Sequence, residues 1–159
     1  MDELLNLLKQ NALASPAILA RQLGLTEEEV RRRIHEYEKE GIIRGYQAVV
    51  DEERLGLERV RAVIEVRITP EREGGFDRLA WRISRFEPVE SVYLMSGSYD
   101  LLVFVTGRSL REVAAFVAEK LATMEGVIST ATHFQLKTYK ERGILMEKSE
   151  PYERLSVSP

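Results

Sequence analysis

The sequence contains no cysteine among its 159 residues, and it has only two histidines and one tryptophan. The absence of cysteine excludes disulfide bonds, cysteine-ligated zinc and a cysteine nucleophile. No apolar run approaches the roughly 18 residues that a membrane-spanning helix needs, so no membrane partner is expected. The N-terminal segment, MDELLNLLKQ, begins with acidic residues and lacks the basic region of a signal peptide. A cytoplasmic protein is therefore expected.

Excess positive charge is also lacking, because 23 lysines and arginines face 26 acidic residues and give a formal net charge of −3. A nucleic-acid-binding chain is usually basic, so this function would need a basic face confined to one element, or several copies acting together. No Ser-His-Asp, paired-acid or phosphate-loop pattern stands out. We therefore predict no catalytic residue, no metal ligand and no cofactor. Hydrophobic residues make up 44% of the chain, which is enough for a packed core.

The first 50 residues carry the start and stop signals of three short helices. A leucine-rich segment predicts the first helix, and Ser15 followed by Pro16 is typical of the start of a second. Gly24 is expected to end that helix in a left-handed conformation. Thr26 should cap a third helix, with Glu29 three residues later completing a capping-box pattern. Two helices joined by a tight turn are the layout of a helix-turn-helix.

The third helix separates into an apolar and a polar side at 100° per residue. Val30, Ile34 and Tyr37 should face the core, with Arg33 near its edge, and Gly41 should end the helix. An extended strand over 42–50 would then form a wing or hinge, making residues 1–50 a winged helix-turn-helix. A recognition helix of this kind enters the major groove of double-stranded DNA, where an arginine fork matches guanine. The predicted DNA contacts are Thr26, Glu28, Arg31, Arg32, His35, Lys39 and Arg44, with Arg32 the first candidate for a base edge.

A plainer interpretation is that this helix is only a solvated face laced with ion pairs. Pairs such as Glu28–Arg32 and Arg32–Glu36 have the required i,i+4 spacing. The three consecutive acids Glu27 to Glu29 suit the helix dipole but stand at the end that usually approaches phosphate. An alternative is therefore a sensing or assembly protein whose helix-turn-helix does not bind DNA.

The rest of the chain predicts alternating strands and helices in the order βαββαβ. The expected strands are 60–68, ended by Pro70, then 91–95, 101–105 and 127–139; the expected helices are 76–86 and a second one that begins after Ser109 and ends at Gly126. This order is that of a ferredoxin-like unit with both helices on one face of the sheet. The fold class is thus α+β, with residues 58–142 as the second domain, 51–57 as a hinge or linker and 143–159 as a C-terminal extension.

The 101–105 strand is apolar on both sides, although the chain itself covers only one sheet face with helices. An uncovered apolar face is a partner surface, so we expect a homodimer that packs sheet against sheet. Two-fold symmetry would present paired recognition helices to a palindromic operator. The alternative is that loops or the C-terminal extension cover this face.

The sequence resembles the Lrp/AsnC (feast/famine) family of prokaryotic transcription regulators over nearly its whole length. The resemblance lies in Leu19-Ala20, Leu23-Gly24-Leu25-Thr26, Val30 with Arg32-Arg33, and Glu40-Gly41-Ile42-Ile43-Arg44-Gly45-Tyr46 running into Val49-Val50-Asp51. It implies a DNA-binding domain, a hinge strand and a ligand-sensing domain (RAM/AsnC type). It also implies homodimers that assemble into higher oligomers. The same family resemblance includes siroheme decarboxylases, so an enzyme on this two-domain plan is a further alternative.

The resemblance also implies a small-molecule effector, in relatives an amino acid, bound near the glycine-containing turn between the second and third sensing strands. A carboxylate there suits an ammonium group and the turn N–H groups suit a carboxylate. The same turn is also compatible with an ordinary hairpin capped by an aspartate. The predicted ligand contacts are Met95, Ser96, Gly97, Ser98, Tyr99, Asp100, Thr130, Thr132 and His133.

Overall fold

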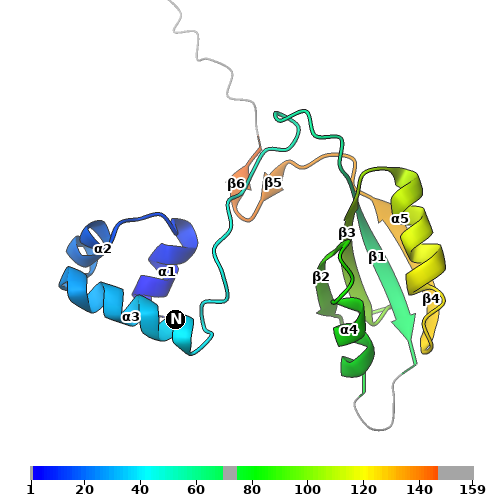
Figure 1. The fold of residues 1–159 in the computed structure, drawn as a ribbon, viewed down its shortest axis with the longest axis horizontal. Coiled ribbons are helices and arrows are strands. Elements are labelled where there is room, and N and C mark those ends of the chain that lie inside the picture. The colour runs from blue at the N-terminus through cyan, green and yellow to red at the C-terminus, as the bar shows by residue number, and fades with distance from the viewer. Residues whose placement is uncertain (1, 70–74, 147–159) are drawn as a thin grey trace, which may run out of the picture. The chain divides into compact units, whose positions relative to one another are not determined.

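The computed structural model describes residues 2–69 and 75–146 and divides the chain into two compact units, Met1–Ala48 and Val49–Pro159 (Figure 1). Each unit has its own hydrophobic core. Pro70, expected to end the first sensing strand, and most of the expected C-terminal extension lie outside the described residues.

The first unit contains helices α1 (Glu3–Gln10), α2 (Pro16–Leu23) and α3 (Glu27–Lys39). The Ser15 hydroxyl accepts a hydrogen bond from the N–H of Ile18, and the Thr26 hydroxyl accepts one from the N–H of Glu29. Gly24 has a φ of 65°, a left-handed conformation that glycine adopts without strain. The predicted caps and the turn of the helix-turn-helix are therefore confirmed.

A small core holds these three helices together. Leu4, Leu19 and Val30 are fully buried, and Ile34 and Tyr37 pack against them from α3. The predicted apolar side of α3 is therefore its buried side, and its charged side is left to solvent.

The predicted strand over 42–50 is wrong in this structure, which has no strand in that segment. Gly41, with a φ of 69°, reverses the chain after α3, and the N–H groups of Ile42 and Ile43 both donate to the carbonyl of Tyr37. These bonds finish the helix and do not build a ladder. A strand needs a neighbouring strand to pair with, and the first unit contains none among its described residues. The unit is therefore a three-helix helix-turn-helix without a wing strand.

The second unit has the predicted βαββαβ order. Its elements are β1 (Val60–Ile68), α4 (Asp77–Ile83), β2 (Val89–Leu94), β3 (Leu101–Gly107), α5 (Leu110–Phe116) and β4 (Val127–Phe134). The four strands form one antiparallel sheet in the order β2-β3-β1-β4. The predicted α+β class and ferredoxin-like topology are confirmed.

One face of this sheet is packed and the other is not. Ile64 and Val66 of β1 and Val103 of β3 are fully buried under α4 and α5, which lie on the same side of the sheet (Figure 1). A short π-helical turn, η1 (Val117–Leu121), continues α5 and keeps Leu121 in the core. The opposite face carries the alternate residues of the same strands, which are only partly buried or exposed.

The last strand is shorter than predicted. It ends at Phe134, which lies opposite Ala62 of β1, and one further backbone bond runs from the N–H of Gln135 to the carbonyl of Arg61. The chain then forms a small hairpin of β5 (Lys140–Glu141) and β6 (Ile144–Leu145), which the sequence analysis did not predict.

Candidate functional site

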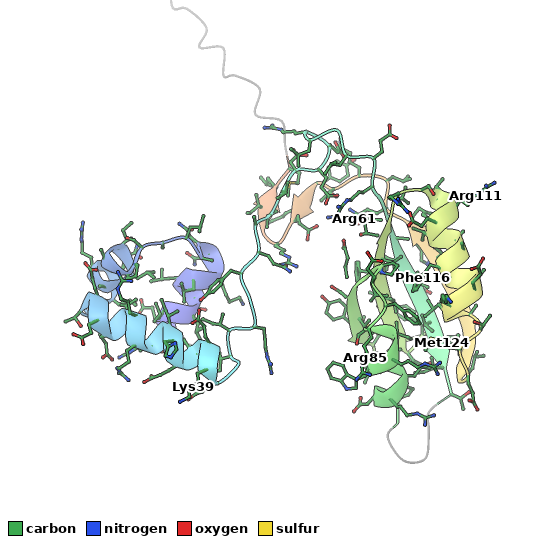
Figure 2. The ribbon with its side chains drawn as sticks, in the orientation of Figure 1. Lys39, Arg61, Arg85, Arg111, Phe116 and Met124 are labelled. Carbon is green, nitrogen blue, oxygen red and sulfur yellow. The ribbon has the colours of Figure 1, made fainter. Side chains whose placement is uncertain are left out.

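The outward side of α3 is a charged surface built by the capped start of the helix and its buried opposite side. Glu28, Arg31, Arg32, His35 and Lys39 are all exposed, as the 100° periodicity predicted. The helix carries five carboxylates and four cations, so the surface is mixed in charge and is not simply basic. Figure 2 shows Lys39 at the C-terminal end of the helix, directed away from its core.

Arg32, the first candidate for base contact, is held by two carboxylates of its own helix. Its Nη2 lies 2.7 Å from Oε1 of Glu29, and its Nη1 lies 2.5 Å from Oε1 of Glu36. The predicted Arg32–Glu36 pair is confirmed, while the predicted partner Glu28 is replaced by Glu29. Hydrogen bonds to Glu29 first, and then to Glu36, raise the pKa of Arg32. The guanidinium is therefore paired with carboxylates in the free protein, and base contact requires these pairs to exchange.

Glu29 is the centre of the ion pairs on this helix, which the sequence analysis missed. Its carboxylate also accepts from Nε of Arg33 at 3.0 Å, and hydrogen bonds from Arg32 and then Arg33 hold its pKa below the ordinary value. The predicted capping box is therefore only half formed: Thr26 caps the helix, but the Glu29 side chain turns to the arginines. The i,i+3 and i,i+4 spacings from Glu29 would have indicated both contacts.

The other cations of this surface are less constrained. Arg31 lies 3.9 Å from Glu27, at the outer limit of an ion pair. Arg44 is exposed, and its guanidinium lies beside Gly41, where an added Cβ would be 3.1 Å from Cζ. Lys39 forms no ion pair with a carboxylate of the described chain.

The β2–β3 turn of the second unit is fastened to the end of β1 by Asp100. The Asp100 carboxylate accepts from the N–H of Ile68 at 2.8 Å, and its own N–H donates to the carbonyl of Val66 at 3.0 Å. The N–H of Met95 donates to the carbonyl of Asp100 and closes the turn. Asp100 therefore has a structural role, and its second carboxylate oxygen has no described hydrogen-bond partner. Gly97 has no non-neighbouring atom within 4 Å of an added Cβ, so the turn is open to solvent there.

The predicted strand contacts of the ligand do not surround one site within this chain. Thr130 pairs with Val66, close to the end of β1 that fastens the turn, whereas Thr132 is two residue pairs further along, opposite Ile64. His133 lies on the other sheet face, where its Nε2 is 3.3 Å from Glu65. Within one chain His133 therefore does not share a face with the two threonines, because successive residues of a strand point to opposite faces.

The uncovered sheet face has an apolar centre. Tyr93 and Phe104 contact each other edge to face with ring centroids 5.9 Å apart, and Leu102 and Val63 are half-buried neighbours on the same face. The Glu65–His133 pair lies at its β4 side. The predicted apolar character of both sides of β3 is confirmed.

No helix within 2–69 or 75–146 is long and apolar enough to cross a membrane. The same segments hold no cluster of three or more His, Asp or Glu side chains arranged to bind a metal ion.

Comparisons with known proteins agree with this architecture. Residues 3–38 match the AsnC-type helix-turn-helix domain, and residues 61–145 match the Lrp/AsnC ligand binding domain. The chain is 46% identical to the uncharacterized HTH-type transcriptional regulator YugG of Bacillus subtilis, over 99% of this chain and 95% of that protein.

Solved structures are similar over both units. E. coli AsnC is 25% identical with a TM-score of 0.66, covering 89% of this chain and 95% of its own. A feast or famine regulatory protein from M. tuberculosis, complexed with L-methionine, is 25% identical with a TM-score of 0.69, covering 87% and 90%. With both domains matched in order and almost the full length shared, the chain belongs to the Lrp/AsnC family of HTH-type transcriptional regulators.

Proposed function

We propose that this regulator binds double-stranded DNA by laying the outward side of α3 in the major groove. The observation that carries the proposal is the exposed polar side of a properly capped second helix of a helix-turn-helix. Arg32 would contact a guanine edge, while Arg31, His35, Lys39 and Arg44 would contact backbone phosphates or neighbouring bases. The exposed carboxylate of Glu28 would accept a hydrogen bond from a cytosine amino group.

The ion pairs of Arg32 set the character of this binding. Each contact of Arg32 with DNA must replace one of its contacts with Glu29 or Glu36. Part of the electrostatic gain on binding is therefore lost in breaking ion pairs within the helix. We therefore expect modest affinity for nonspecific DNA and dependence on a matching base edge.

Fluorescence anisotropy with the promoter of the protein's own gene tests this function. Arg32→Ala should weaken binding by about 1–3 kcal/mol, the range for a specific arginine contact. Arg111→Ala, an exposed position at the start of α5 in the sensing unit, is the matched control and should bind like the parent protein. Binding by neither the parent nor the control at low salt would instead favour a helix-turn-helix that does not read DNA.

We further propose that the sensing unit binds a small metabolite with an ammonium and a carboxylate, an amino acid, at the turn from Met95 to Asp100. Support comes from the L-methionine bound to the M. tuberculosis protein and from the second oxygen of the Asp100 carboxylate. Ser96, Ser98 and Tyr99 would supply N–H or hydroxyl groups from the turn, and Thr130 would lie nearest among the strand residues.

The functional assembly would be a homodimer formed through the uncovered sheet face, with further association of dimers. The apolar centre around Phe104 and Tyr93 supports this arrangement, because a patch of this kind is stabilised by burial. A two-fold axis would present two copies of α3 to a palindromic operator. Such a protein would act in the cytoplasm, where prokaryotic DNA is found.

This function requires no catalytic group. The siroheme-decarboxylase alternative needs a histidine near the iron, and the two histidines of the chain lie one in each unit: His35 on α3, and His133 paired with Glu65. We propose that the protein is not an enzyme. After mixing with siroheme and removal of the unbound tetrapyrrole by gel filtration, the protein fraction should carry no porphyrinoid absorbance band.

A further inference from the structure

A polar cavity of about 170 Å³ lies at the start of β1, within the second unit. One wall is the segment 50–59 that leads into β1, and the other is the chain from 135 to 146 that follows β4. This cavity is separate from the β2–β3 turn, because the turn is fastened to Ile68 at the opposite end of β1. No predicted ligand residue lines it.

Arg61, which is labelled in Figure 2, lines the cavity. Its guanidinium is incompletely satisfied. Its Nη2 lies 3.2 Å from Glu52, and its Nη1 lies 3.9 Å from Glu141. Its Nε is buried and has no hydrogen-bond partner, alone in this among the side-chain nitrogens and oxygens of the described chain. A buried N–H without an acceptor is unfavourable, and a carboxylate is the acceptor that a guanidinium binds best.

The rest of the lining provides both signs of charge and an apolar wall. Arg59 and Lys137 are exposed cations that form no ion pair with a carboxylate of the described chain, and Glu53 is an exposed carboxylate without a described cation partner. Apolar side chains complete the lining: Val50, Leu57, Leu136 and Met146. Such a mixture suits neither a simple anion nor a purely apolar ligand.

We propose that this cavity is a second small-molecule site, which binds an apolar α-amino acid. The ligand carboxylate is bound by Arg61 Nη1, whose contact with Glu141 is long, and by Arg59. The ammonium group is bound by Glu53, and the apolar side chain packs against Leu57 and Met146. The site goes beyond the effector site at the β2–β3 turn. Because its walls are the linker from the helix-turn-helix and the segment after β4, an occupied cavity ties these two segments together.

Isothermal titration of the full chain with L-leucine and L-methionine tests the ligand chemistry. Two matched probes are 4-methylpentanoate, which lacks the ammonium group of leucine, and 3-methylbutylamine, which lacks the carboxylate. Both should bind at least tenfold more weakly than L-leucine. Equal affinity of 4-methylpentanoate and L-leucine, or no binding of either amino acid, would overturn the proposal.

NMR of the arginine Nε–H groups identifies the site during the same titration. The Arg61 signal, assigned by its loss in Arg61→Lys, should shift as amino acid is added. Arg59→Gln changes an exposed position without an ion pair, so this variant should fold normally. The amino-acid affinity that the Arg61 shift reports should fall at least tenfold in it. Arg111→Gln is the matched control and should leave it unchanged. An Arg61 signal that stays fixed, while the backbone amide signals of residues 95–100 shift in the same titration, would overturn this site. It would leave both DNA binding and the turn site standing.

Discussion

The two units differ in how much of their structure depends on burial. The helix-turn-helix is built around five buried side chains, whereas fourteen form the core of the sensing unit. Since burial of apolar surface is the main stabilising contribution, each core residue of the first unit carries a larger share of its stability. The smaller unit compensates with local devices: a side-chain hydrogen bond caps each of its three helices.

The surfaces of the two units also differ, in that one is charged and the other is apolar. On α3 several of the charges are paired within the helix, and Glu29 contacts both Arg32 and Arg33. On the uncovered sheet face the centre is aromatic and aliphatic, with Tyr93 against Phe104. The first surface suits a partner that competes for charged groups, and the second suits a partner that covers apolar area.

Matched core truncations give the largest expected effect. Leu19→Ala in the first unit and Ile64→Ala in the second each remove a fully buried side chain and should each cost about 2–5 kcal/mol. Trp81, the only tryptophan, lies on α4 of the sensing unit and reports on that unit alone. In urea titrations, Ile64→Ala should shift the tryptophan transition, while Leu19→Ala should shift the helical circular-dichroism signal and leave the tryptophan transition in place. A single transition, shifted equally by both, would contradict the independence of the cores.

A charge on the uncovered sheet face gives the next largest effect. Phe104→Asp places a carboxylate beside Tyr93 at the proposed dimer contact, where it would be desolvated without a partner. Light scattering after size exclusion should find the parent dimeric or larger and the variant monomeric at micromolar concentration. Trp81→Ser, an exposed position on the helix side, is the control and should keep the parent mass. Monomeric parent protein would contradict the proposal.

Removal of one N-cap hydroxyl from each unit compares how much helix capping contributes to the stability of that unit. Thr26→Ala and Ser109→Ala each delete a hydroxyl that accepts from the N–H three residues later, with an expected cost of about 0.5–2 kcal/mol. Because the first unit has the smaller core, Thr26→Ala should cause the larger drop in its melting temperature. Differential scanning calorimetry measures both, and a larger drop with Ser109→Ala would reverse the order we infer.

Acid titration gives the smallest effect. The pKa of Glu29 is held below its ordinary 4.5 by Arg32 and Arg33, and the pKa of Glu112 by the backbone and then the side chain of Arg108. A lowered folded-state pKa stabilises the fold above about pH 4.5, and this contribution is lost as pH falls through the folded value. Glu29→Gln should therefore flatten the dependence of melting temperature on pH in the first unit between about pH 5 and 3, and Glu112→Gln in the second. An unchanged slope in both would show that these contacts are too exposed to contribute.

Much of this architecture could be predicted because its signals are local. Ser15 with Pro16, Gly24 and Thr26 determine helix ends through backbone chemistry within four residues, and the alternation from Ala62 to Ile68 indicates one buried face. These signals do not depend on the rest of the chain. The exposed side of α3 followed from the same periodicity.

The sequence was less informative where the outcome depends on competition or on distant partners. Glu29 could cap the helix or pair with arginines, and two guanidinium groups outcompete one backbone N–H. The segment after Gly41 is extended, but whether it becomes a strand depends on a neighbour that the sequence does not reveal. The sheet face on which His133 lies depends on the strand register. The cavity at Arg61 is lined by segments more than 70 residues apart in the sequence.

The stretch from Arg44 to Ala48 has one further consequence. It is exposed throughout and contains neither helix nor strand, and the division between the compact units falls at its end. Substitutions or exchanges at this seam disturb no buried side chain. Gene recombination at this point would join the second unit to a different helix-turn-helix domain. DNA specificity and effector specificity could then evolve independently.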